Sequence, residues 1–289
     1  MIAISGLTKR YRGVAAVDDL SLEIPSGSVC GLLGRNGAGK TTAFKCLLGF
    51  TRPDAGTMLF DGEPLAPATF EKLGYVPERP QLYGWMTVKE HLELIRRSHP
   101  KYDAAHANEL VGIFRLDPRK KAKRLSKGQQ TALSLIVALA TKPSLLILDE
   151  PASGLDPVMQ RAILDLLIDS ATSGATILLS SHQIGQIERA ADHVAILRDG
   201  RLVLSGEIDD LRAASKIVEA TFEAGIPEIG EIDGVSRFDR AGKTLRAYTN
   251  GRTDAVAARL GELGGNGVRV VDRTLEDLFL DAVADGGSR

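Results

Sequence analysis

Cysteine is scarce in this sequence, with only Cys30 and Cys46 among 289 residues. Both are flanked by apolar residues, and neither belongs to a CxxC pair or to a cluster with the spacing of metal ligands. We therefore expect two small buried side chains in a reducing compartment, and neither a disulfide nor a metal site at these positions.

Long apolar runs are also missing. The longest apolar stretch, residues 133–140, is far shorter than the roughly 18 residues that a membrane-spanning helix needs. Residues 1–13 lack the apolar core of a signal peptide. If the protein works at a membrane, we expect another chain to span it.

Neither sign of charge is in excess, because 36 Lys and Arg residues balance 37 Asp and Glu residues. This balance removes the overall electrostatic signature of a nucleic-acid-binding protein, and no nucleic-acid partner is expected. A basic stretch at residues 119–124 is interpreted as a solvated face.

What is present is an alternation of apolar runs and helical patterns over residues 1–215. It predicts an α/β fold with a mostly parallel sheet and right-handed crossovers. The spacing of Thr87 and Glu90 is that of a capping box, which opens a mostly helical segment over residues 87–142. Strands are predicted at residues 2–5, 20–24, 29–33, 57–60, 74–77, 145–148, 176–180 and 194–197, and other helices at 40–49, 157–173 and 183–191.

The alternation restarts after residue 215, which predicts a separate small α/β domain over residues 216–289. Gly, Asp and Pro punctuate residues 225–242, where no element is assigned. Strands are predicted at residues 216–223, 243–248 and 268–271, and helices at 254–263 and 274–283.

A phosphate-binding loop is the clearest motif. Residues 34–41, GRNGAGKT, match GxxxxGK[ST] between a predicted strand and a helix, which is the context that the motif requires. Backbone N–H groups of such a turn point at phosphate oxygens, and the helix adds its positive end. The residues expected to hold the nucleotide are Gly34, Asn36, Gly37, Gly39, Lys40, Thr41 and Thr42, with Thr41 also placed to ligate Mg²⁺.

A pair of carboxylates, Asp149 and Glu150, follows the buried strand at residues 145–148. The strand carries them to the carboxyl edge of the sheet, where open α/β sheets bind ligands. We expect Asp149 to hold Mg²⁺ through its waters and Glu150 to polarise the attacking water. Phosphoryl transfer needs mainly placement and charge neutralisation, which these groups can supply.

Further segments resemble the motifs of ATP-binding cassette (ABC) ATPases, in the same order along the chain. Residues 125–130, LSKGQQ, resemble the signature motif, and residues 153–156, SGLD, resemble the D-loop. His182 resembles the switch histidine, and Tyr11 resembles the aromatic residue that stacks on adenine. The resemblance covers about residues 1–215 and implies a cassette with a mostly parallel core sheet, an antiparallel β subdomain and a helical subdomain.

The resemblance also implies a mechanism. Two cassettes, identical or different, would dimerise head to tail around two ATP molecules. Residues Ser126, Gly128, Gln129 and Asp156 are thereby expected to contact nucleotide, and His182 to contact the γ-phosphate and act in catalysis. Closure driven by ATP and release after hydrolysis would be coupled to work in a separate membrane permease, at the cytoplasmic face of the membrane.

Two positions depart from the family pattern. Glu78 stands where the family usually has Gln, and its carboxylate can still reach Mg²⁺ through oxygen. Lys127 stands where many members have Gly, and it adds a cation near the triphosphate. Nearby, Tyr83 and Trp85 either form part of a docking groove for the membrane subunit or pack in the core.

The last helical pattern, residues 273–280, is similar to the tail of ATPase subunits from bacterial drug, antibiotic-resistance and bacteriocin-immunity exporters. This tail and Glu78 favour export over import. The alternative class is an ABC ATPase that acts on ribosomes or nucleic acid, but one cassette, no heptads and a balanced charge disfavour it. Glu150 argues against a regulatory protein that binds ATP without turnover.

Overall fold

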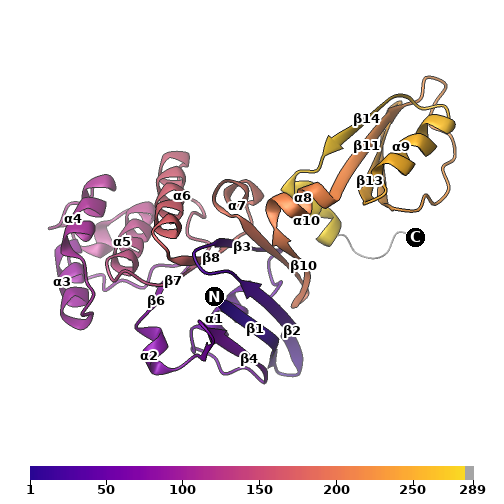
Figure 1. Ribbon diagram of the computed structural model, residues 1–289. Helices are drawn as coiled ribbons and strands as arrows, with labels where there is room; N and C mark the ends of the chain where they lie inside the picture. Colours follow the sequence, from indigo (N-terminus) through magenta and orange to yellow (C-terminus); the bar gives the residue numbers. More distant parts are fainter. Residues whose placement is uncertain (284–289) are drawn as a thin grey trace. The chain divides into compact units, whose positions relative to one another are not determined.

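The computed structural model describes residues 1–283, and the side chains of all of these except residues 67 and 68. The chain forms two compact units, one of residues Met1–Ser205 and one that begins at Gly206 (Figure 1). The division falls before residue 215, where the sequence pattern places it, because the helix α8 (Ile208–Ala214) packs against the first strand of the second unit, β11 (Ser215–Thr221).

A six-stranded sheet forms the centre of the first unit, in the order β10-β9-β3-β8-β7-β6. The neighbours from β9 to β6 pair in parallel. Every residue of β3, β7 and β8 is buried, which accounts for the continuous apolar runs of these strands. The strands are β3 (Val29–Gly34), β6 (Leu73–Val76), β7 (Leu145–Asp149), β8 (Thr176–Ser181), β9 (His193–Arg198) and β10 (Arg201–Glu207).

An antiparallel sheet of order β2-β1-β4-β5 completes the strands of this unit. The predicted strands at residues 2–5 and 20–24 are too short, because a bulge after Ile4 breaks the alternation while pairing continues. Gly6 sits in the bulge with a φ of +61°. The strands are β1 (Ile2–Tyr11), β2 (Val14–Ile24), β4 (Ala55–Phe60) and β5 (Glu63–Pro64).

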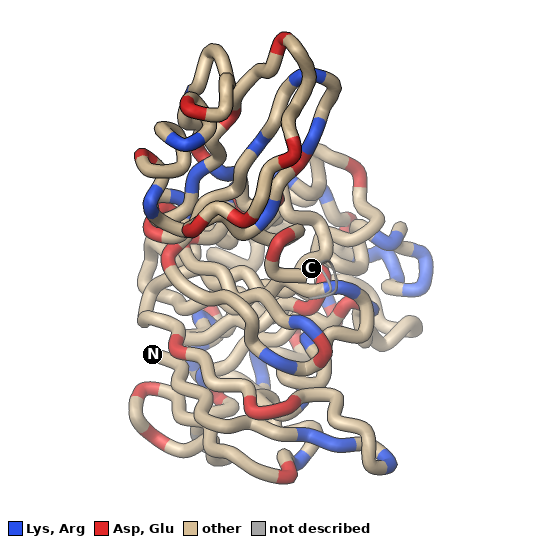
Figure 2. The backbone as a smooth tube through the Cα atoms, turned by 90° about the vertical axis from the view of Figure 1, so that its right-hand side faces the viewer, with Lys and Arg blue, Asp and Glu red and all other residues tan. Residues whose placement is uncertain are grey.

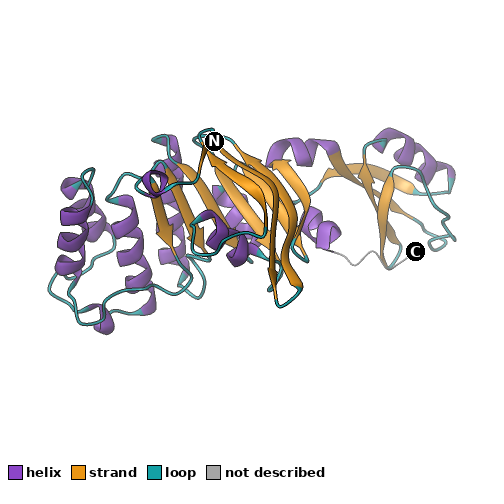
Figure 3. Ribbon diagram, turned by 90° about the horizontal axis from the view of Figure 1, so that it is seen from below, coloured by secondary structure: helices purple, strands orange, loops and turns teal. Residues whose placement is uncertain are grey.

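The predicted helical segment after Thr87 is confirmed, and capping side chains begin its three α-helices. The Thr87 N–H donates to Glu90 Oε2 at 2.6 Å, and the Glu90 N–H donates to Thr87 Oγ1 at 3.2 Å, which completes the capping box. In Figure 3 a group of helices of this unit lies to one side of its strands, and α5 connects this group to the sheet by packing against β6. The helices are α1 (Lys40–Leu47), α2 (Pro67–Phe70), α3 (Val88–Ser98), α4 (Ala104–Ile113), η1 (Ala122–Arg124), α5 (Lys127–Leu139), α6 (Pro157–Thr172) and α7 (Ile184–Ala190).

The second unit has an antiparallel sheet of order β12-β13-β11-β14, with α9 packed on it. Buried side chains of α9, such as Val256 and Leu260, meet Val218 and Leu245 of the sheet to form a separate core. Strand β12 lies inside the stretch to which the sequence assigns no element, because its residues are only half-buried and alternate weakly. The remaining elements are β12 (Val235–Ala241), β13 (Thr244–Asn250), α9 (Thr253–Glu262), β14 (Asn266–Asp272) and α10 (Leu275–Val283).

The two cysteines are small buried side chains, as expected. Cys30 and Cys46 are both free, and each is 1% exposed. Burial, with a smaller contribution from Asp192, raises the pKa of Cys30 to about 12. Acidic and basic residues are interspersed along the backbone (Figure 2). Within residues 1–283, no helix is long and apolar enough to cross a membrane.

Candidate active site

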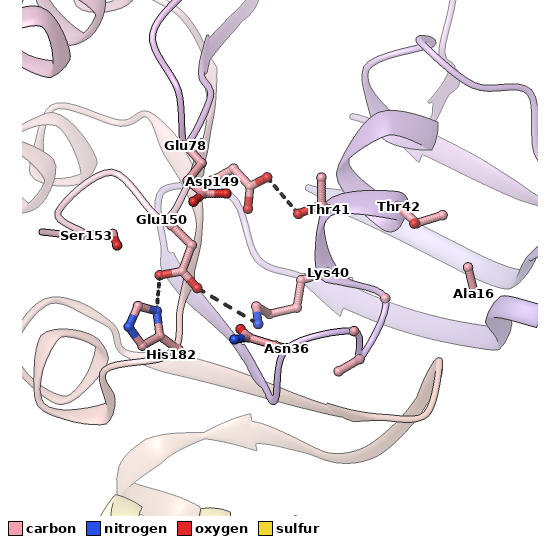
Figure 4. A pocket seen from close by; sticks show the side chains of 13 residues that line it. Ala16, Asn36, Lys40, Thr41, Thr42, Glu78, Asp149, Glu150, Ser153 and His182 are labelled. Carbon is pink, nitrogen blue, oxygen red and sulfur yellow. Dashed lines mark hydrogen bonds and ion pairs between the residues drawn. The ribbon is translucent and has the colours of Figure 1, made fainter. Parts of the chain in front are cut away.

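A pocket of about 450 Å³ opens at the carboxyl ends of the parallel strands (Figure 4). It brings together segments that are far apart in the sequence: the loop between β3 and α1, Glu78 shortly after β6, the end of β7, and His182 directly after β8. Its lining consists of Ala16, Asn36, Gly37, Ala38, Gly39, Lys40, Thr41, Thr42, Glu78, Asp149, Glu150, Ser153 and His182.

The phosphate-binding loop forms because its glycines adopt conformations that other residues avoid. Gly37 and Gly39 have φ angles of +85° and +103°. A Cβ atom on Gly39 would lie 2.4 Å from the carbonyl oxygen of Ala16, so a side chain does not fit there. The loop then enters α1, whose first residue is Lys40, and residues 36–42 line the pocket, which places the start of this helix at the site as an anion site requires.

Lys40 is buried to 7% exposure, and its ammonium lies within its own loop. Nζ donates to the carbonyl oxygen of Gly34 at 2.7 Å and lies 3.9 Å from Glu150 Oε1. Burial lowers the pKa of Lys40, and the nearby carboxylates of Glu150 and Asp149 partly oppose this shift. The pocket therefore holds a cation that is poorly solvated and close to the carboxylate pair.

Asp149 is fixed by two hydroxyl groups. Thr41 Oγ1 donates to Asp149 Oδ2 at 2.9 Å, and Ser180 Oγ donates to Asp149 Oδ1 at 2.7 Å. The carboxylate is only 3% exposed, and Glu78 lines the same pocket. A hydroxyl and two carboxylates form a hard oxygen set that suits Mg²⁺, which binds proteins through few side chains and completes its shell with water and phosphate.

The described residues contain no cluster of three or more His, Cys, Asp or Glu side chains that could hold a metal ion by themselves. A cation in this pocket would accordingly depend on Thr41, Asp149 and Glu78 together with oxygen atoms from outside the chain. This is how Mg²⁺ is held where it accompanies substrate phosphates.

Glu150 lies between Lys40 and His182 (Figure 4). His182 Nδ1 is 2.7 Å from Glu150 Oε2, and the Glu150 N–H donates to Ser180 Oγ at 3.0 Å. Glu150 has a φ of +50°, a conformation that is uncommon for a residue with a side chain and that clusters at functional sites. The carboxylate is thus held at the pocket by contacts on both sides.

Several of the predicted nucleotide-binding residues lie outside this pocket. Tyr11 is 46% exposed, with the ammonium of Lys9 5.4 Å from the centre of its ring. Gly34 lies just behind the loop, where its carbonyl accepts from Lys40. Stacking of adenine on Tyr11 stays a prediction.

The signature residues and Asp156 likewise do not line the chain's own pocket, and they lie at the starts of helices. Ser126 Oγ accepts from the Gln129 N–H at 3.2 Å, and Gln129 Oε1 accepts from the Ser126 N–H at 3.2 Å. Asp156 accepts from the N–H groups of Val158 and Met159 and so caps α6. Their contacts with nucleotide also stay predictions, which require a second molecule.

Three lining residues were missed by sequence reasoning. Ala16 carries no signal at all, because a small residue within a strand reaches the site only through its contact with Gly39. Ala38 lies inside the phosphate loop motif, and its position there could have identified it. Ser153 follows Glu150 closely and belongs to the segment that resembles the D-loop, which is a signal that was available.

Comparison with known proteins gives consistent matches. The model of the ABC transporter family matches residues 17–153. The chain is 33% identical over 245 residues to the ABC transporter ATP-binding protein YtrB of Bacillus subtilis, with 84% of each chain covered. It is 34% identical over 294 residues to the Nod factor export ATP-binding protein I of Cupriavidus metallidurans, with 97% of this chain and 96% of the relative covered.

Solved structures match the first part of the chain. The ATP-binding subunit of an ABC transporter superposes with a TM-score of 0.68 at 31% identity, covering 74% of this chain and 92% of that one. A dimeric ATP-binding cassette in a post-hydrolysis state with ADP and phosphate shares the fold, with a TM-score of 0.65 at 22% identity, covering 72% of this chain and 98% of that one. With the phosphate loop and the carboxylate pair in one pocket, these matches establish that the chain belongs to the ATP-binding cassette family and is an ATP-hydrolysing subunit of an ABC transporter.

Proposed function

We propose that this subunit hydrolyses Mg²⁺-ATP with Glu150 as the carboxylate that polarises the attacking water. The single observation that carries the proposal is the position of Glu150, 2.7 Å from His182 and 3.9 Å from the Lys40 ammonium in the pocket of the phosphate loop. Mg²⁺, when bound by Thr41, Asp149 and Glu78, supplies positive charge to the phosphate oxygens. Lys40 adds a second charge, and His182 orients Glu150 and reaches toward the γ-phosphate.

The test is the ATPase rate of Glu150→Gln, which keeps the size of the side chain and removes its basicity. We expect the rate to fall about a hundredfold or more, the range typical of a lost general base. Glu109→Gln, whose side chain is 69% exposed on α4, serves as the matched control and should hydrolyse ATP at the wild-type rate. Equal rates for Glu150→Gln and wild type would remove Glu150 from the mechanism.

We also infer that two cassettes close around ATP, each placing Ser126 at the nucleotide of the other. Ser126 and Lys127 are exposed and do not line their own pocket, while Ser126 caps the N-terminal end of α5, the end of a helix that favours an anion. A nucleotide bound by Lys40 of one molecule would therefore also be contacted by the start of α5 of the other molecule.

Cross-linking tests this arrangement directly. Asn36→Cys combined with Ser126→Cys should give disulfide-linked dimers when ATP is added to the Glu150→Gln background. The native Cys30 and Cys46 are buried and should not contribute. Asn36→Cys with Ser173→Cys, at the far end of α6, should stay monomeric, and equal cross-linking of both pairs would count against the dimer.

The proposed partner is a membrane permease, and the proposed location is the cytoplasmic face of the membrane. Tyr83 and Trp85 support a docking surface, because they are 55% and 68% exposed and so do not belong to the core. Their rings lie 6.0 Å apart, and the Lys123 N–H donates to the Gly84 carbonyl at 3.1 Å, which brings the basic stretch beside them. Large exposed aromatic residues are typical of interfaces.

Transport by export is the proposed direction. The Nod factor export relative matches over 97% of this chain, and the tail of the chain resembles that of exporter subunits. Purification from detergent-solubilised membranes should recover a partner with several membrane-spanning helices, and Trp85→Ala should lose it. Ile113→Ala changes an exposed residue at the end of α4; it is the control and should retain the partner. Recovery of a soluble nucleic-acid complex instead would overturn the transport assignment at this site.

A further inference from the structure

One side chain of the signature segment makes a contact that the sequence does not predict. Lys127 is the first residue of α5, and its Nζ donates to the backbone carbonyl of Ser153 at 2.7 Å. Ser153 lines the nucleotide pocket of the same chain. The segment that we expect to act on a neighbouring molecule is therefore bonded to the rim of its own pocket.

The packing around this bond is close on both sides. Gly154 has a φ of +69°, and a Cβ atom placed there would lie 3.0 Å from Lys127 Nζ. A Cβ atom on Gly128 would lie 3.5 Å from Leu155. The positive φ of Gly154 lets the loop turn beside Lys127, a Cβ atom on Gly128 would make only an ordinary contact, and Lys127 supplies the polar contact between the loop and the start of α5.

The bond continues into the catalytic carboxylate through a single turn. The Ser153 N–H donates to the carbonyl oxygen of Glu150 at 3.1 Å. The Glu150 side chain in turn contacts His182 and faces Lys40. A displacement of α5 would accordingly be transmitted through Lys127 to the loop that begins at Glu150.

We propose that Lys127 is a positioning residue that couples the two nucleotide sites of the dimer: it ties the segment that grips the partner's nucleotide to the loop that lines its own pocket. The proposal rests on the proposed function, since it needs Ser126 to act in a second molecule. Binding of ATP between α5 and the neighbouring phosphate loop then also sets the Glu150 loop of the first molecule, so that hydrolysis at the two sites is cooperative.

The experiment measures the ATPase rate against ATP concentration for wild type, Lys127→Met and Lys127→Arg. Lys127→Met keeps the length of the side chain and loses the donor, whereas Lys127→Arg keeps a donor. We expect a sigmoid curve for wild type, a Hill coefficient that falls to one in Lys127→Met with a maximal rate about three- to tenfold lower, and recovery of both in Lys127→Arg. Lys101→Met, an exposed lysine outside the pocket lining, is the matched control and should keep the wild-type curve.

Other outcomes would overturn the proposal. An unchanged Hill coefficient in Lys127→Met, with a raised ATP concentration at half-maximal rate, would mean that Lys127 binds nucleotide directly. A Hill coefficient of one in wild type would exclude coupling even where Ser126 cross-links to Asn36 of a second molecule. Loss of that cross-link in the Glu150→Gln background would instead count against the proposed dimer, so the two failures are distinguishable.

Thermal unfolding separates coupling from simple stability. The bond is exposed and joins a cation to a neutral carbonyl, so Lys127→Met should unfold within a few degrees of wild type. A large loss of stability that Lys127→Arg restores together with the Hill coefficient would assign Lys127 a purely structural role.

Discussion

At the scale of single residues, the pocket depends on positions where the backbone conformation or a close contact restricts which residue fits. Gly39 meets two requirements at once, a φ of +103° and the contact with Ala16, so its replacement is penalised both by strain and by a clash. Glu150 shows the opposite case, because it carries a side chain despite a φ of +50°. Seven other described residues with side chains share nearly this φ and do not line the pocket, so the role of Glu150 rests on its contacts with His182 and Lys40 rather than on its backbone.

Gly39→Ala is therefore expected to weaken ATP binding about tenfold or more, since strain of this kind costs about 1–3 kcal/mol. Titration of the protein with a fluorescent ATP analogue measures the effect. Gly62→Ala is the matched control, because Gly62 has a φ of +82° but nothing within 4 Å of the added Cβ atom. It should bind ATP as wild type does; equal weakening by both substitutions would show that clash with Ala16 is not the cause.

At the scale of elements, two helices of the first unit begin with capping boxes that can be recognised in the sequence. Thr87 with Glu90, and Ser126 with Gln129, form the same reciprocal pair of hydrogen bonds. The first pair lies away from the pocket lining, while the second begins the helix that we expect to face a partner's nucleotide. A comparison of the two separates the cost of a lost cap from the cost of lost function.

Thr87→Ala should lower the free energy of unfolding of the first unit by about 1 kcal/mol and leave the ATPase rate of the folded protein unchanged. Ser126→Ala should cost a similar stability and, in addition, lower the rate. Urea unfolding and a rate assay on the same samples measure both quantities. Thr172→Ala, at an exposed position in the last turn of α6 without an N-terminal capping role, should stay within about 0.5 kcal/mol of wild type. Normal activity of Ser126→Ala would contradict the part proposed for α5.

At the scale of the whole molecule, the chain divides into two units with separate hydrophobic cores. The first core lies between its two sheets, and the second lies between α9 and the sheet of β11, β12, β13 and β14. Each core buries its own large aliphatic side chains, so we expect each unit to unfold independently of the other.

Leu260→Ala tests this division, because Leu260 of α9 is fully buried in the second core. We expect the free energy of unfolding of the second unit to fall by about 2–5 kcal/mol. Its calorimetric transition should move to a lower temperature, while the transition of the first unit stays in place. Addition of ATP should raise only the first transition. A single transition that moves as a whole in both experiments would show that the two units unfold together.

Sequence alone determined the features whose physical requirements are local. The phosphate loop, the carboxylates Asp149 and Glu150, and the capping box at Thr87 each need particular residues at short spacing, and the structure places them as predicted. Fully buried strands such as β7 and β8 were also predictable, because burial on both faces demands a continuous apolar run. Element ends were less so, as the bulge in β1 shows.

Only the tertiary structure decided which distant segments meet. The approach of Ala16 to Gly39, the bond from Lys127 to Ser153 and the exposure of Tyr83 and Trp85 all follow from the order of strands and the packing of helices on them. No short stretch of sequence encodes these features, because each depends on residues that are far apart in the chain or on what the fold leaves uncovered. The sequence thus specified the chemical groups of this ATPase, while the fold determined how they are positioned and linked.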